Sequence, residues 1–509
     1  MASPNRRAAQ LVMIRADARH WDDVEYRRTI ERLIDRGVGG VGVFLGGLEQ
    51  TAQMIEHMQQ RAGRQLLIAA DYEHGLPMRL EGGIAFPRAM ALGRCSASTT
   101  ETVARLIAEE ANAIGVHWNW APVADINSNP NNPIVNTRSF GETPETVTEH
   151  ARAYVRGTQS VKVMACAKHV PGHGDTHVDS HRDLPTIELA PDLAREREFI
   201  PFRGCIDEGV QSLMIGHIVV PFLDPSSPAS LSAHVVSGLV REQWGFDGLV
   251  TTDALDMGAI TSRYTSAQAA CAAVEAGCDV VLMPENADEA IDALVEAIES
   301  GRLSEARLQE SERRWQQARR FVGLRTPDTP HRSRAQQMTV DQNAHALVAL
   351  QAADEALRVV GAADLLPITQ AKHVAAFAIV DEHSVESATT WFQSIAQGAD
   401  VNVDFGYVDL SITSDECASL RQGIAESDLV IFGVFGKAVA FRGELGSTSR
   451  LPEIIAALRG DRRSIVVACG SPYGIDATLA DTVIYTYSDT LPSIAASVLR
   501  LVGKAVPKN

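Results

Sequence analysis

The stretch VMACAKHVPGHGDTHVDSHRDLP, residues 163–185, passes from an apolar run into a segment crowded with ionisable side chains. Its first seven residues have the length and character of a short buried strand. Lys168 and His169 end that run, and the glycines and prolines that follow disfavour a helix. The stretch therefore predicts a buried strand that leads directly into a polar, irregular loop.

Working outward from this strand, the first 300 residues repeat the same pattern. Short apolar runs alternate with segments of helical period at 102–114, 144–160 and 267–276, as expected of βα units with a parallel sheet. Eight such units predict a (β/α)8 barrel of the TIM type. The seven other runs lie at 11–14, 41–45, 66–70, 116–120, 212–218, 248–252 and 279–283.

A second domain is predicted after the barrel. We assign residues 1–322 to the barrel, the polar segment 323–340, which holds Pro327 and Pro330, to a linker, and residues 341–509 to a smaller three-layer α/β sandwich. Neither a Walker A loop nor a G-x-G-x-x-G fingerprint occurs in it, so nucleotide binding has no support. Its strands are predicted at 356–360, 374–380, 429–435, 464–469 and 483–487.

Composition narrows the range of partners and locations. The 509-residue chain has a formal net charge of −18, which opposes general binding to nucleic acid or to an anionic membrane. The N-terminal segment lacks the apolar core of a signal peptide, and no stretch is apolar for long enough to span a bilayer. The seven cysteines show no CxxC pairing, which favours a reduced, cytoplasmic protein without a disulfide framework.

Polar residues follow many of the predicted strands. Barrel enzymes place their chemistry at the carboxyl ends of the strands, so these are the positions to inspect. A single aspartate there could simply cap the next helix, but the coincidence recurs at several strands. The strand-end residues are Asp71, Asp125, Lys168, His169, His217 and Asp253.

Three interpretations compete for the loop at 167–185. Its histidines and aspartates are metal-ligand types, but the order HxDxHxDxH does not match an established zinc motif, so we expect no metal. A merely solvated loop does not explain so many imidazoles. In the third interpretation Asp179 and His181 form an acid/base pair, because an aspartate on one ring nitrogen leaves the other free to transfer a proton.

A glycosidic bond also requires a carboxylate at the anomeric carbon. Asp253 ends the apolar strand in GLVTTDALDM and is the stronger candidate, whereas Asp256 lies three residues later in the following loop or helix. The alternative for Asp253 is a helix N-cap.

The string KHVPGHGDTHVDSH, with TDALDM downstream and NPNNPIVNTRSFG upstream, closely resembles the β-N-acetylglucosaminidase branch of glycoside hydrolase family 3, in its two-domain form. The resemblance implies that Asp179 and His181 are the acid/base dyad and that Asp253 is the nucleophile. It implies no cofactor. It further implies sugar-binding roles for Asp71, Arg79, Arg138, Lys168 and His169.

The chain departs from the family pattern after Asp71. The family segment usually reads DxEGGxVxR, whereas here His74 replaces a glycine and Pro77 stiffens the turn before Arg79. This departure puts in doubt the identity of the leaving group more than the reaction mechanism.

The expected activity is therefore that of a retaining exo-β-N-acetylglucosaminidase acting on a small carbohydrate or glycopeptide such as a peptidoglycan fragment. Within the family, a β-N-acetylglucosaminide phosphorylase and a β-glucosidase remain open. Outside it, the alternatives are a metal-dependent hydrolase and a non-catalytic carbohydrate-binding protein. The sequence predicts neither the oligomeric state nor the leaving group.

Overall fold

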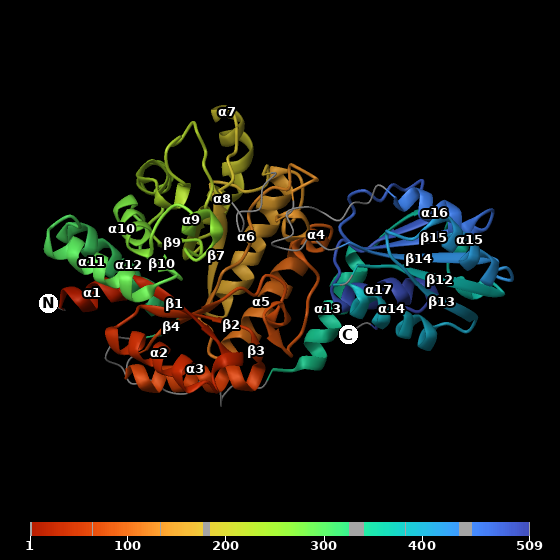
Figure 1. Cartoon of the computed structure of the whole chain (residues 1–509), viewed down its shortest axis with the longest axis horizontal. Coiled ribbons are helices and arrows are strands. Elements are labelled where there is room, and N and C mark those ends of the chain that lie inside the picture. The colour runs from red at the N-terminus through yellow and green to blue at the C-terminus, as the bar shows by residue number, and fades with distance from the viewer. Residues whose placement is uncertain are drawn as a thin grey trace. The chain divides into compact units, whose positions relative to one another are not determined.

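The computed structural model describes residues 3–63, 65–132, 134–176, 184–324, 340–381, 383–436 and 450–507. The chain forms two compact units (Figure 1). One comprises Met1–Ile84, Thr100–Val135 and Ser139–Gln342, and the other comprises Ala85–Thr99, Asn136–Arg138 and Asn343–Asn509.

The first unit is built on an eight-stranded parallel sheet in the order β10-β1-β2-β4-β6-β7-β8-β9. A parallel bridge between Thr251 and Val280 joins the two ends of this order, so the sheet closes into a barrel. All eight predicted strands are present, which confirms the barrel fold. They are β1 (Val12–Asp17), β2 (Gly40–Phe44), β4 (Leu67–Ala70), β6 (Trp118–Asn119), β7 (Met164–Val170), β8 (Ser212–Ile215), β9 (Leu249–Thr252) and β10 (Val281–Leu282).

Large side chains fill the barrel interior. Trp118, Trp120 and Met164 belong to one buried cluster that also takes in residues of β1, β2, β4, β8 and β9. Glycine is required beside them at Gly42, where an added Cβ would lie 2.6 Å from the Trp120 ring. The interior is therefore a packed core, and any ligand must bind at the mouth of the barrel, where the strands end.

Amphipathic helices surround these strands in Figure 1. A typical one is α2 (Val24–Arg36). Asp23 is its N-cap, and Gly37, whose φ of 107° suits a left-handed conformation, is its C-cap. The other long helices of the barrel region are α3 (Leu48–Ala62), α5 (Ala97–Ala113), α6 (Pro144–Ser160), α8 (Phe199–Asp207), α10 (Ser266–Ala276), α11 (Ala287–Glu299) and α12 (Glu305–Phe321). Shorter elements are α1 (Pro4–Gln10), α7 (Pro191–Leu193), α9 (Gly258–Thr261), β3 (Gly46–Gly47), β5 (Leu80–Glu81) and the π-helices η4 (Ala194–Glu198) and η6 (His234–Gln243).

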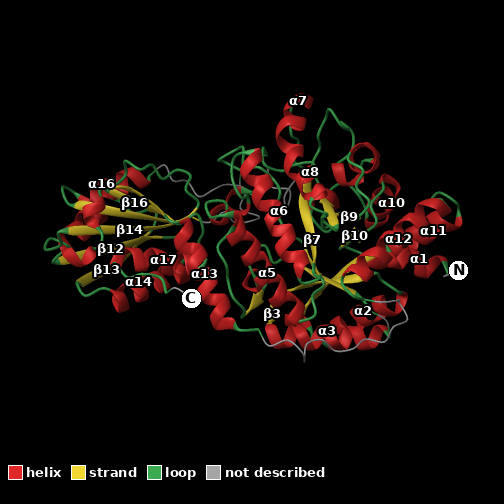
Figure 2. Cartoon of the chain, turned by 180° about the vertical axis from the view of Figure 1, so that it is seen from behind, coloured by secondary structure: helices red, strands yellow, loops and turns green. Residues whose placement is uncertain are grey.

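The second unit is a three-layer sandwich, as predicted. Its six-stranded sheet has the order β11-β16-β15-β14-β12-β13 and is parallel except for the edge strand β11. Residues of α15 and α16 pack in one core cluster and residues of α14 and α17 in another, so helices cover both faces of the sheet (Figure 2). The elements are α13 (Gln342–Ala356), β11 (Arg358–Gly361), β12 (His373–Ile379), α14 (Val385–Gly398), β13 (Asn402–Val408), α15 (Ser414–Gly423), β14 (Leu429–Gly436), α16 (Leu451–Arg459), β15 (Arg463–Gly470), β16 (Thr482–Tyr485) and α17 (Leu491–Val502).

The division of the chain differs from the contiguous boundaries predicted from the sequence. Ala85–Thr99, which carries α4 (Ala89–Leu92), groups with the second unit, because Met90 and Ala91 pack in the same core cluster as Phe377. Arg88 also forms an ion pair with Asp489. Most of the predicted linker, residues 325–339, lies outside the described residues.

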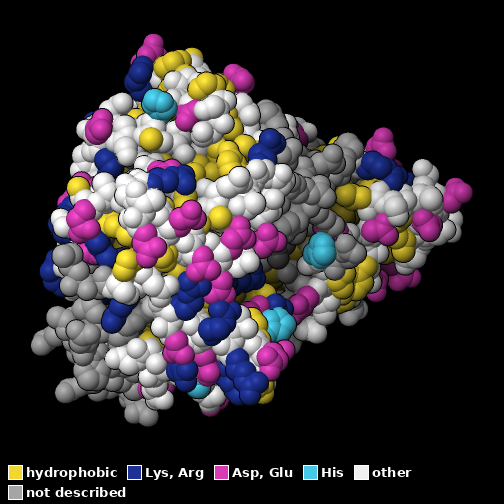
Figure 3. Space-filling view, turned by 60° about the vertical axis from the view of Figure 1, so that its left-hand side comes forward, with side chains coloured by type: hydrophobic (Ala, Val, Ile, Leu, Met, Phe, Trp, Pro, Cys, Tyr) yellow, Lys and Arg dark blue, Asp and Glu magenta, His cyan; other side chains and the backbone are white. Residues whose placement is uncertain are grey.

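Two surface properties bear on partners. On the face drawn in Figure 3, Lys and Arg side chains are interspersed with Asp and Glu side chains. Within the described ranges, no helix combines the length and apolar character needed to cross a membrane.

Candidate active site

Asp71, Lys168 and Asp253 converge at the carboxyl ends of three barrel strands. Each continues the alternate positions that point into the barrel, because side chains two apart on a strand share a face. Burial raises the pKa of the Cys166 thiol to about 12, and the charges of Asp71, Lys168 and Asp253 all influence that pKa. The inward series is marked by Leu67 and Ala69 on β4, Met164 and Cys166 on β7, and Leu249 on β9.

Asp71 belongs to an ion cluster of four residues. Lys168 is only 2% exposed, and its ammonium group donates to Asp71 Oδ1 at 2.8 Å and also lies 2.8 Å from Glu73 Oε1. Arg79 Nη2 donates to Asp71 Oδ2 at 2.8 Å. Burial alone would raise the pKa of Asp71, but Lys168 and Arg79 outweigh it and lower the pKa to about 2. The cluster thus presents fixed charges that can hydrogen-bond to sugar hydroxyls.

Asp253 is held as a carboxylate at the end of β9. Burial raises its pKa, but the charges of His169 and His217, the Ala254 N–H and Lys168 outweigh it, so the pKa lies below its ordinary value. Its Oδ1 accepts from Ala254 N at 2.8 Å. The N-cap alternative is excluded, since α9 begins at Gly258 with Met257 as its N-cap.

His217 anchors the backbone next to Asp253. It is fully buried, and its Nε2 lies 2.9 Å from the Ala254 carbonyl oxygen, which can only accept. Nδ1 lies 2.7 Å from Ser230 Oγ. His217 therefore donates a hydrogen bond from Nε2 to the Ala254 carbonyl and fixes the turn that follows the strand.

Asp125 organises the start of the loop after β7. It is fully buried and pairs with His169 Nδ1 at 2.7 Å, while its Oδ1 accepts from the His173 N–H at 2.8 Å. Burial raises the pKa of Asp125, but the two histidines and their hydrogen bonds lower it overall. With Nδ1 facing Asp125, the Nε2 atom of His169 remains for a ligand.

The structure describes only some of the other predicted site residues. Asp179 and His181 lie outside the described residues, so their acid/base role stays a prediction. Arg138 lies in the short turn η3 (Asn136–Arg138), which groups with the second unit. In the described part of the chain no His, Cys, Asp or Glu cluster is arranged to hold a metal ion.

Sequence reasoning missed three residues at this end of the barrel. Glu73 shares Lys168 with Asp71, and the guanidinium carbons of Arg15 and Arg79 lie 4.4 Å and 5.2 Å from the centre of the Phe44 ring. A signal was present for the other two, because Phe44 lies late in the predicted strand 41–45 and Arg15 directly follows the predicted strand 11–14. His74 is buried, and Pro77 lies in the short turn η2 (Leu76–Met78) before Arg79.

A buried acid lies beside the loop that begins after β7. Glu198 is 4% exposed, and its Oε1 accepts from Arg197 Nε at 2.6 Å, whereas its Oε2 has no hydrogen-bond partner within the described ranges. Burial raises the pKa of Glu198 to about 7 against the opposing effect of Arg197, and the charges of Asp125 and Asp175 raise it further. Gly172 permits this placement, since an added Cβ would lie 3.0 Å from Oε2.

Glu198→Gln is therefore expected to change how stability depends on pH. The carboxyl binds a proton more tightly in the folded chain, so its contribution is full below about pH 4 and is lost as pH rises through about 7. The free energy of unfolding of Glu198→Gln minus that of wild type should therefore be about 3 kcal/mol larger at pH 8 than at pH 5. Urea unfolding of both proteins at the two pH values measures this, with the exposed Glu188→Gln as control. An equal difference at both pH values would contradict it.

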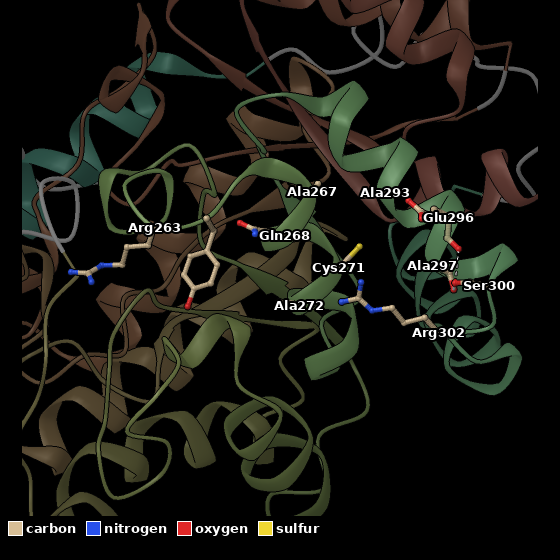
Figure 4. A pocket seen from close by; sticks show the side chains of 11 residues that line it. Arg263, Ala267, Gln268, Cys271, Ala272, Ala293, Glu296, Ala297, Ser300 and Arg302 are labelled. Atoms are coloured by element: carbon tan, nitrogen blue, oxygen red, sulfur yellow. Dashed lines mark hydrogen bonds between the residues drawn. The ribbon is translucent and has the colours of Figure 1, made fainter.

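A separate surface pocket lies between α10 and α11. It has a volume of about 540 Å³, and its described lining residues include none of the predicted site residues. Figure 4 shows Cys271 and Arg302 on its wall. The ionisable groups described above are thus distinct from this pocket.

Comparison with known proteins places these residues in a family. The sequence profile of the Glycosyl hydrolase family 3 N terminal domain matches residues 5–318. The chain is 33% identical over 318 residues to Beta-hexosaminidase A of Pseudoalteromonas piscicida, an alignment that covers 55% of this chain and 53% of that protein. It is 32% identical over 278 residues to a Beta-hexosaminidase of Xylella fastidiosa (strain M23), covering 52% of this chain and 82% of the relative.

Several solved structures match nearly the whole chain. One of them is a glycoside hydrolase family 3 beta-N-acetylglucosaminidase from Paenibacillus sp. str. FPU-7, with a TM-score of 0.83, 29% identity, and coverage of 99% of this chain and 97% of that one. By contrast, the chain spans about half the length of the Pseudoalteromonas relative. The family match covers more than half of this sequence, from the first helix to α12, and the chain therefore belongs to glycosyl hydrolase family 3.

Proposed function

We propose that this protein is a retaining β-N-acetylhexosaminidase that removes terminal β-linked N-acetylglucosamine, with Asp253 as the nucleophile. The observation that carries the proposal is the state of Asp253. It is an ionised carboxylate at the carboxyl end of a barrel strand, and its position points into the barrel, as do those of Asp71 and Lys168 on their strands. The names of the bacterial relatives support the choice of sugar.

The proposed reaction is a double displacement. Asp253 Oδ1 accepts the Ala254 N–H, which leaves Oδ2 to attack the anomeric carbon while His181 protonates the glycosidic oxygen. A covalent glycosyl-aspartate forms and the leaving group departs. His181, oriented by Asp179, then deprotonates a water molecule that attacks the same carbon, so the configuration is retained.

The charged residues around Asp253 are proposed to bind the non-reducing sugar. The Asp71 carboxylate can accept from sugar hydroxyls, while Lys168, His169 and Arg79 can donate to them. Arg79 Nε is buried and has no hydrogen-bond partner within the described ranges, as expected of a donor that awaits a ligand. We include Arg138 in this set on the family resemblance alone.

Two finer points rest on the resemblance. We propose a peptidoglycan fragment as the substrate and the cytoplasm as the location, which suits a small-molecule recycling enzyme without a cofactor.

A histidine acid/base carries no negative charge in its basic form, so it does not repel phosphate as a carboxylate would. Phosphorolysis to a sugar 1-phosphate is therefore a second candidate reaction on the same site.

The proposal is tested with the chromogenic substrates 4-nitrophenyl β-N-acetylglucosaminide and 4-nitrophenyl β-glucoside, each with and without inorganic phosphate. We expect rapid cleavage of the N-acetylglucosaminide, and analysis of the released sugar distinguishes hydrolysis from phosphorolysis. Cleavage of the glucoside alone would retain the mechanism and overturn the substrate. No cleavage of either, with or without a chelator, would point to a binding protein, whereas activity abolished by a chelator would point to a metal-dependent hydrolase.

A further inference from the structure

Arg15 is a cation at the mouth of the barrel that the proposed mechanism does not use. It lies two residues after Met13 on β1, and Met13 belongs to the interior cluster, so both side chains leave the strand on the inner side. Arg15 is also the exposed residue of this otherwise buried strand, with 45% of its side chain accessible. A side chain that points inward and is nevertheless exposed must face open space at the mouth.

The core beneath Arg15 is closed. Its partner in the neighbouring strand is Gly42, where even a Cβ would collide with Trp120 and Met283. The guanidinium therefore extends away from the core, toward the ends of the strands. There its carbon atom lies 4.4 Å from the centre of the Phe44 ring, a stacking distance that holds the planar group in place.

Arg15 and Arg79 approach the same ring but differ in their pairing. Arg79 donates to Asp71 at 2.8 Å, so its charge is balanced. The carboxylate nearest to Arg15 is that of Asp256, at 3.8 Å, which is too long for a hydrogen bond, and both side chains are about a third to a half exposed. Within the described part of the chain, the Arg15 guanidinium is thus held against Phe44, but its N–H groups donate no side-chain hydrogen bond of ordinary length.

The position of Asp256 indicates which side of the substrate Arg15 faces. Asp256 follows the proposed nucleophile Asp253 by three residues, so the Arg15 guanidinium lies beside the loop that follows β9. Asp71, Lys168 and Arg79 already supply the contacts proposed for the non-reducing sugar. The remaining place for a ligand of Arg15 is the leaving-group side, which an incoming acceptor also occupies.

We infer that Arg15, stacked on Phe44, binds an oxyanion on the leaving-group side of the site, either a carboxylate of the leaving group or an inorganic phosphate acceptor. An arginine fork matches both anions with paired hydrogen bonds. The weak pair with Asp256 orients the fork until such an anion displaces it. The inference rests on the proposed glycosidase activity and adds to it a preference for anionic leaving groups or acceptors.

Two disaccharides that differ in one carboxylate test this assignment. These are N-acetylglucosaminyl-β-1,4-N-acetylglucosamine and its counterpart whose reducing sugar bears a lactyl ether. We expect wild type to favour the carboxylated substrate. In Arg15→Met, which replaces the guanidinium by an unbranched apolar end, the ratio of the two kcat/KM values should fall about tenfold, mainly through KM. Arg15→Lys should restore part of it, and the exposed Arg28→Met is the matched control.

Assays with inorganic phosphate test whether the anion bound by Arg15 is a phosphate acceptor rather than a carboxylate of the leaving group. If the oxyanion is an acceptor, wild type releases a sugar 1-phosphate, and Arg15→Met raises the KM for phosphate about tenfold while leaving the disaccharide ratio as in wild type. If Arg15→Met, folded as judged by its melting temperature, changes neither quantity, the inference is overturned. If wild type cleaves neither disaccharide nor an aryl N-acetylglucosaminide, the proposed function itself fails, a result seen before any variant is compared.

Discussion

Asp253→Ala should lower the turnover of an aryl β-N-acetylglucosaminide by about 10⁴-fold or more, because the variant lacks the group that forms the covalent intermediate. Sodium azide should restore turnover, since the small anion can enter the space left by the carboxylate. The product should then be a glycosyl azide of inverted configuration, because only one displacement occurs. Absorbance assays measure the rate, and NMR of the product gives the configuration.

Asp256→Asn is the matched comparison for this experiment. Asp256 is exposed and lies in the same loop, so its loss should affect turnover far less than the loss of Asp253. A large loss at Asp256 combined with near-normal turnover in Asp253→Ala would reverse the assignment. Loss at Asp253 without any azide rescue would leave its role as a nucleophile unsupported.

Lys168→Met should cause the largest loss of stability. Lys168 is buried between the carboxylates of Asp71 and Glu73, both at 2.8 Å, and its removal leaves two negative charges with less compensation. Breaking such a buried pair costs about 3–5 kcal/mol. Urea unfolding at pH 7, followed by fluorescence, should show the loss in the transition of the barrel. Binding of the sugar should weaken as well.

The pH dependence of that loss provides a second check. The pKa of Asp71 is lowered to about 2, so its ion pairs stabilise the fold above about pH 4 and are lost as pH falls through about 2. The difference between wild type and Lys168→Met should therefore narrow in acid. Adding Glu73→Gln should restore part of the stability, whereas Lys162→Met, on the surface, should cost less than about 1 kcal/mol. A penalty independent of both pH and Glu73 would contradict the account.

The sequence predicted the strands of the barrel well, because each is a short run of apolar residues between amphipathic helices. It missed β13 in the second unit, an edge strand whose residues are mostly exposed and whose pattern, NVDFGYV, is too polar to stand out. Edge strands are buried on fewer sides, so their hydrophobic signal is weak.

The site was predicted in part for a similar reason. Asp71, Lys168 and Asp253 were visible because each directly ends an apolar strand. Glu73 was not, since its role depends on the turn that brings it back to Lys168. Arg15 directly follows the predicted strand 11–14, but a charged side chain there could also face outward, and the closed barrel shows that it points inward.

The packing of Ala85–Thr99 has a consequence for how such a chain can be inherited. The core of the second unit includes Met90 and Ala91, which the gene encodes in the midst of the barrel, between β4 and β6. A recombination event at the segment before α13 would transfer the sandwich without these residues and expose part of its core to water. A sandwich transferred at that point is therefore expected to be less stable than one that keeps Ala85–Thr99.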